Sequence, residues 1–135
     1  MRRALRTAFT LGTIFALLLV PSVVAAQTPL MSIDRDADLS PAGALITISG
    51  SITCETGESF LVEVLVTQGD GPNQETAFSQ LGGAECVGAP QVWDSLAQSV
   101  TGRFHKGKAT VKVHGFLFRP DSFEEFLLDR TIRLR

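Results

Sequence analysis

Three aspartates near the start of the chain are spaced like the carboxylates at the start of a calcium-binding loop. Asp34, Asp36 and Asp38 alternate with other residues, as the first three ligands of a calcium-binding loop do. That loop needs glycine at its sixth position and glutamate at its twelfth, where this chain has Leu39 and Leu45. We therefore expect no metal here and predict a solvated strand at a sheet edge, where charge deters pairing with other molecules.

The histidines and serines of the chain do not form a catalytic set. His105 and His114 lie in a basic stretch, with no further ligands nearby in sequence for a metal site and no nucleophile for a catalytic pair. Ser49 and Ser51 lack the glycine-flanked turn that exposes a nucleophilic serine. We expect a protein that is not an enzyme, with no catalytic residues and no cofactor.

The two cysteines are best interpreted as a disulfide. Cys54 and Cys86 are the only cysteines of the chain. A zinc site would need more ligands, and a redox pair would need the close C-x-x-C spacing. A disulfide is the simplest state for two cysteines in a small domain of an oxidising compartment.

The first 26 residues have the three parts of a secretory signal peptide. They comprise an arginine-rich start, an apolar run over residues 8–20, and small residues before a cleavage point after Ala26. The apolar run is too short to span a bilayer comfortably. We expect a cleaved leader over 1–26, one domain over 27–135, and a secreted, extracellular protein with no membrane attachment after cleavage.

The charge of the chain changes once the leader is removed. Three of the 12 basic residues and none of the 14 acidic ones lie in the leader, which leaves a net charge of −5. Residues 103–135 nevertheless hold eight basic residues against four acidic ones. A secreted acidic domain does not fit a nucleic-acid partner.

Apolar and polar residues alternate along most of the chain after the leader. Alternation with a period of two is typical of half-buried strands. Turn-forming glycine, proline and asparagine separate these runs. The clearest runs cover residues 46–54, 60–67 and 109–115, and further strands are expected at 77–81, 84–87, 91–99 and 130–135. The pattern predicts an all-β fold, an antiparallel β-sandwich of about seven strands with one disulfide.

Several motifs at the strand ends add to this prediction: Gly50–Cys54, Gln68, Cys86–Gly88, Gln91-x-Trp93 and Gly107–Ala109. With these motifs, residues 30–135 resemble the secreted bacterial immunoglobulin-like domains. The resemblance implies an immunoglobulin-like sandwich and export, and it implies no particular activity. Trp93 follows both cysteines, whereas an antibody domain has its core tryptophan between them. We expect Trp93 to pack in the core rather than to serve as a ligand platform.

One segment gathers the candidate interaction residues. It holds four of the seven phenylalanines that follow the leader, on either side of a polar tip. Residues 123–128 fit either a short helix, with capping-box spacing from Ser122 to Glu125, or the second arm of a long hairpin. The rings either close the core as a lid or stay exposed to bind a partner. The candidate residues are Phe116, Phe118, Arg119, Asp121, Phe123 and Phe126.

These observations together predict a secreted, non-enzymatic binding or structural module. We expect a monomer whose partner is an unknown extracellular protein or small ligand. One alternative is a carrier of a small apolar ligand, which would need an apolar cleft of several hundred cubic ångströms. Another is a secreted hydrolase inhibitor, which would present a protruding rigid loop.

Overall fold

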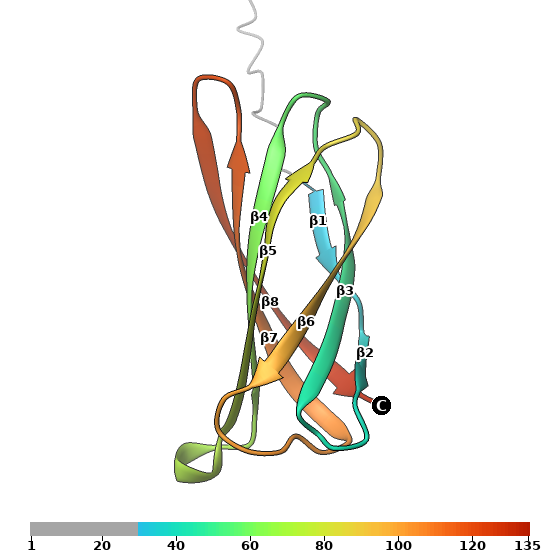
Figure 1. The fold of residues 1–135 in the computed structure, drawn as a ribbon, viewed down its shortest axis with the longest axis vertical. Coiled ribbons are helices and arrows are strands. Elements are labelled where there is room, and N and C mark those ends of the chain that lie inside the picture. Colours follow the sequence, from blue (N-terminus) through green and yellow to red (C-terminus); the bar gives the residue numbers. More distant parts are fainter. Residues whose placement is uncertain (1–29) are drawn as a thin grey trace, which may run out of the picture.

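A computed structural model describes residues 30–135 of the chain as an all-β domain (Figure 1). The predicted leader lies outside these described residues. None of the described helices is long and apolar enough to cross a membrane. The elements are β1 (Leu30–Ile33), β2 (Asp36–Leu39), β3 (Leu45–Thr53), β4 (Ser59–Gln68), the 3₁₀ helix η1 (Gly71–Asn73), β5 (Glu75–Glu85), β6 (Gln91–Ser99), β7 (Gly107–Phe118) and β8 (Phe123–Leu134).

Seven of the eight strands close into a barrel. The strand order is β3-β2-β8-β7-β4-β5-β6, with β6 pairing back onto β3, and β1 adds to the edge of β3. All of these pairings are antiparallel except that of β2 with β8, which is parallel. The antiparallel sandwich predicted from the sequence is therefore wrong, because a mixed, closed barrel forms instead.

The barrel closes through β2, which belongs to the acidic segment Asp34–Asp38. β1 and β2 both pair with β3, and β2 also pairs with β8 along its other edge. The amide of Arg133 donates to the carbonyl of Arg35 at 2.7 Å, and the amide of Arg135 donates to that of Ala37 at 3.0 Å. The expectation of an unpaired, charged edge at Asp34–Asp38 is thus corrected, since β2 has a strand on each side.

The core follows from the alternation that the sequence shows. Isoleucines of β3 and valines of β4 and β7 point inward at every second position and are fully buried. The core prediction for Trp93 is confirmed, because its ring is buried opposite Gly50 and its Nε1 donates to the carbonyl of Ser32 at 3.2 Å. A Cβ atom at Gly50 would collide with that carbonyl, so the approach requires glycine.

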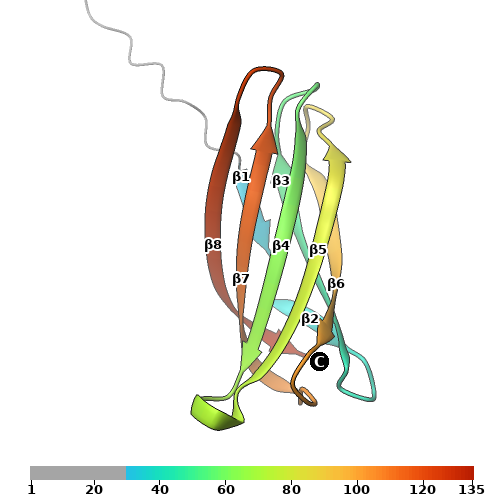
Figure 2. The same ribbon diagram turned by 60° about the vertical axis from the view of Figure 1, so that its left-hand side comes forward.

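The seam between β5 and β6 is short, like the one between β2 and β8. Backbone pairing covers only Ala77 with Ser99 and Phe78 with Gln98. Further along, the two strands separate, as seen in Figure 1, whereas they overlap in the view of Figure 2. There the buried hydroxyls of Ser79 and Ser95 hydrogen bond to each other at 2.8 Å, so side chains continue the contact where the backbone ladder stops.

Candidate functional site

The segment that holds the candidate interaction residues is a long hairpin of β7 and β8. Phe118 pairs with Phe123 next to the turn, and the amide of Arg119 donates to the carbonyl of Ser122 at 2.8 Å. Residues 123–128 are strand, so the hairpin alternative is confirmed and the short helix is not formed. The hairpin tip stands at one end of the barrel (Figure 1).

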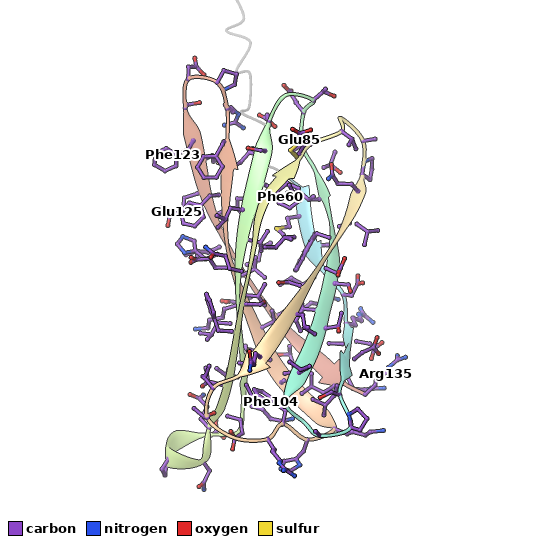
Figure 3. All side chains as sticks on the ribbon, in the orientation of Figure 1. Phe60, Glu85, Phe104, Phe123, Glu125 and Arg135 are labelled. Atoms are coloured by element: carbon purple, nitrogen blue, oxygen red, sulfur yellow. A yellow bond between two sulfur atoms is a disulfide. The ribbon has the colours of Figure 1, made fainter. Side chains whose placement is uncertain are left out.

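Strand alternation divides the four phenylalanines between the two faces of the hairpin. Phe126 is half-buried and packs against the core. Phe118 and Phe123 lie on the outer face, with 42% and 66% of their surface exposed, and Leu127 on the same face is 76% exposed. Figure 3 shows Phe123 pointing away from the barrel. The segment is thus part core and part exposed surface.

Arg119 anchors the hairpin to the rest of the barrel. Its Nε donates to Glu58 Oε1 at 2.7 Å, and its Nη1 lies 3.0 Å from Glu124 Oε2. The hydrogen bonds to these two carboxylates raise the pKa of Arg119 above its ordinary value. Asp121 is exposed at the hairpin tip and takes no part in this ion-pair cluster.

The disulfide lies beside the same anchor. Cys54 and Cys86 are bridged, with their Cα atoms 5.5 Å apart, which confirms the predicted pairing. The amide of Cys86 donates to the carbonyl of Glu58, and Glu58 Oε2 accepts from the amide of Glu55. The sulfur and carboxylate atoms of Cys54, Glu58 and Cys86 lie within 4.8 Å of one another. The sulfurs are bonded to each other and so offer no thiolate to a metal.

His114 has partners that sequence spacing did not indicate. Its Nδ1 lies 3.6 Å from Glu63 Oε2, its Nε2 contacts Glu125, and its ring centroid is 4.4 Å from that of Phe116. Glu63 lies on β4 and Glu125 on β8, on either side of β7. Only the strand order brings these three side chains together, and no sequence motif signals it. His105 lies elsewhere, in the loop before β7.

Two hollows in the described part of the barrel have a mixed lining of charged, polar and apolar groups. One of about 400 Å³ is lined by Arg35, Asp36, Lys108, Arg130, Thr131, Ile132 and Arg133. Another of about 360 Å³ is lined by Leu39, Ser40, Pro41, Gly43, Phe104, His105, Lys106 and Arg135. Neither reaches Trp93 or the exposed phenylalanines of the hairpin, where an apolar carrier would need its cleft.

Comparison with known proteins gives similarity in structure only. No protein-family model matches the chain, and no curated protein is significantly similar in sequence. The structure of AggA, the major subunit of aggregative adherence fimbriae type I from Escherichia coli, is 12% identical, with a TM-score of 0.47; the match covers 79% of this chain and 93% of that one. The periplasmic chaperone SfaE is 9% identical, with a TM-score of 0.34, over 77% of this chain and 54% of its own length. We draw no functional conclusion from similarity at this level.

Proposed function

We propose that this chain is an extracytoplasmic, non-enzymatic module that binds a protein partner through the outer face of the β7–β8 hairpin. The observation that carries the proposal is the exposure of Phe118, Phe123 and Leu127 on one face of an anchored hairpin. We call these three residues, with the half-buried Phe116, the hairpin patch. Contiguous exposed apolar surface is typical of interaction sites.

The composition of the hairpin patch fits a protein partner. Phe118 and Phe123 are directly opposite each other across the strands, so their rings form one surface. Aromatic side chains are common anchors of protein interfaces because they bury a large area at a low cost in conformational entropy. Polar side chains, those of Glu125 and His114, border the patch, as the polar rim of an interface does.

The anchoring of the hairpin supports binding by a preorganised surface. Arg119 holds the base of the turn to Glu58, next to the Cys54–Cys86 disulfide. A surface that is already ordered loses less conformational entropy when it binds. A protruding, anchored hairpin also fits the hydrolase-inhibitor alternative, in which the partner is an enzyme.

The extracytoplasmic location is proposed on the leader and the disulfide together. The signal peptide predicted over residues 1–26 would direct the chain out of the cytoplasm. A disulfide persists in oxidising compartments and is rare in the cytosol.

The experiment compares two pairs of substitutions in exposed apolar residues. Phe118→Ala/Phe123→Ala alters the hairpin patch, and Val92→Ala/Leu96→Ala is the matched control on β6, where the side chains are 78% and 57% exposed. An otherwise wild-type protein that carries a photocrosslinking residue at Leu127 is incubated with the extracellular fraction of its source. The partner that it crosslinks is identified and then purified without the crosslink. Its affinity for each variant is then measured.

The proposal expects the hairpin variant to lose at least tenfold in affinity and the control variant to keep wild-type affinity. Both variants should have wild-type stability, because exposed side chains contribute little to folding. Equal affinity of the two variants for the purified partner, or crosslinking no stronger than from a probe placed at Val92, would contradict the proposal.

A further inference from the structure

The larger hollow lies where β2 closes the barrel against β8. Lys108 comes from β7, Arg130 and Arg133 from β8, and Arg35 from the residue before β2. The volume of about 400 Å³ is that of a small-ligand site. Four basic residues from three places in the chain therefore line one hollow.

The charge of this hollow is opposite to that of the molecule. After the leader, the chain has nine basic and fourteen acidic residues, and four of the nine basic ones line this hollow. Asp36 is the one carboxylate among its lining residues, and Asp36 is paired with Arg135. Among the described residues, no ion pair joins Arg35, Lys108, Arg130 or Arg133 to a carboxylate, so the hollow keeps a net positive charge.

Two of these cations are neighbours on the outer face of adjacent strands. Lys108 and Arg133 occupy directly opposite positions in the antiparallel pairing of β7 with β8, and both are exposed. Like charges in that relation destabilise a sheet. An anion between them would remove the repulsion, so the arrangement is better suited to a bound state than to an empty one.

Arg130 is held in place in the same hollow. Its Nη1 donates to the carbonyl of Ile33 on β1, and its side chain is half-buried. The other guanidinium N–H groups of Arg130 are not used by that bond. A guanidinium that is already positioned can bind two oxygens of one phosphate or sulfate group at a small entropic cost.

We propose that this hollow binds a sulfate or phosphate group, and that Lys108, Arg130 and Arg133 contact it. A tetrahedral oxyanion carries several oxygens and up to two charges, which matches a lining of several cations better than a single carboxylate does. The group can arrive as a free ion or as a substituent of a sulfated polysaccharide. This site is separate from the hairpin patch, so either proposal can fail without the other.

The experiment measures binding by the full domain of two probes, inorganic pyrophosphate and dextran sulfate, by calorimetry and by thermal unfolding. Sodium chloride at matched ionic strength controls for general screening. The test variants are Lys108→Gln and Arg133→Gln. The matched control is Lys112→Gln, which removes the same charge from the same strand but stands opposite Asp129 and does not line the hollow.

The proposal expects at least one probe to bind and to raise the Tm of the wild-type domain by several degrees. Each test variant should lose about tenfold or more in affinity, and Lys112→Gln should keep wild-type affinity. Binding of pyrophosphate identifies a site for the free ion, whereas binding of dextran sulfate alone identifies a polymer-borne group. Without any probe, Lys108→Gln should raise the Tm slightly, because it relieves the repulsion from Arg133.

Two results would overturn the proposal. One is the absence of binding by both probes beyond the effect of sodium chloride. The other is an equal loss of affinity in Lys112→Gln, which would show that only the net charge matters.

Discussion

Arg119 Nε donates a hydrogen bond to Glu58 Oε1 at 2.7 Å, and this contact joins the β7–β8 hairpin to the turn between β3 and β4, 61 residues away in sequence. Glu58 is one of the few buried polar residues among those that the structure describes. A buried carboxylate is costly unless it is paired. The ion pair therefore satisfies Glu58 and fixes the hairpin with a single side chain.

Removing the guanidinium should loosen this end of the barrel. We expect Arg119→Gln to lower the Tm by a few degrees, because Glu58 would keep its burial and lose its cation. Arg119→Lys should recover only part of the loss, since an ammonium group cannot reach both Glu58 and Glu124 in the same geometry. Thermal unfolding of the three proteins tests this, with the exposed Arg103→Gln as control. An equal effect of the control would count against the anchor.

The stability contributed by the Arg119–Glu58 pair should not change at moderately alkaline pH. Hydrogen bonds to Glu58 and Glu124 raise the pKa of Arg119. The stability it contributes is fully present below the ordinary arginine pKa and is lost only as the pH rises through the still higher folded value. The difference in Tm between wild type and Arg119→Gln should therefore stay constant from about pH 7 to pH 10. A difference that shrinks over this range would contradict the assignment.

Loss of the disulfide should be the largest single change in stability. Cys54 and Cys86 are separated by 32 positions, and closing a loop of that length contributes about 3–4 kcal/mol in the chain-entropy account. Urea unfolding of Cys54→Ala/Cys86→Ala should show that loss relative to the oxidised wild type. Reductant should destabilise the wild type and leave the double variant unchanged. Two alkylatable thiols in the purified protein under non-reducing conditions would disprove the bridge.

The sequence predicted the strands better than their closure. Alternation located β3, β4 and β7 because each has one buried and one outer face over nine or more residues. It could not predict that β2 pairs with β8, since the contact covers only Asp36 with Arg133 and Ala37 with Leu134. A parallel pairing of two residues between segments nearly a hundred positions apart leaves no local signal, and charge at Asp36 suggested an edge.

The sequence predicted only part of the candidate site, and the rest was missed for a similar reason. The phenylalanine cluster was visible in sequence, but which rings face out depends on the register of Phe118 with Phe123. The contacts of Arg119 with Glu58 and of His114 with Glu63 cross strands that are distant in sequence. Long-range partners of single polar residues follow from strand order, which the pattern of hydrophobic residues does not specify.

Gly115 and Phe126 should be coupled in stability. They are directly opposite each other on β7 and β8, and a Cβ atom on Gly115 would collide with the ring of Phe126. Gly115→Ala should therefore cost about 2 kcal/mol from overpacking. In a Phe126→Leu background the same substitution should cost much less, because the ring is gone. Urea unfolding of the double-mutant cycle measures the coupling, and additive costs would contradict the contact.

Added metal ions should not stabilise the domain. The Asp34–Asp38 segment is part of the β2 seam, where Asp36 is paired with Arg135. Both ring nitrogens of His114 contact a carboxylate, and a zinc ion would have to displace one of them. We expect neither Ca²⁺ nor Zn²⁺ to raise the Tm, and EDTA to have no effect. A rise of several degrees that EDTA reverses, and that His114→Gln abolishes, would identify a zinc site.

Gln68 should control the loop that closes the end of the barrel opposite the hairpin. Its Oε1 accepts from the amide of His105 at 2.8 Å, and its Nε2 donates to the carbonyls of His105 and Lys108 at 2.8 and 3.1 Å. These bonds hold the loop that places the buried ring of Phe104 at this end (Figure 3).

Gln68→Ala should lower stability by about 1–2 kcal/mol, because three hydrogen bonds to backbone groups are lost. Gln68→Glu should be comparably harmful, since a carboxylate can accept from the His105 amide and cannot donate to the two carbonyls. Gln98→Ala, an exposed glutamine on β6, is the control and should change stability by less than about 0.5 kcal/mol. Hydrogen exchange at the His105 amide gives a local readout. It should accelerate in Gln68→Ala and less so in Gln68→Glu, and unchanged protection in both variants would show that another group holds the loop.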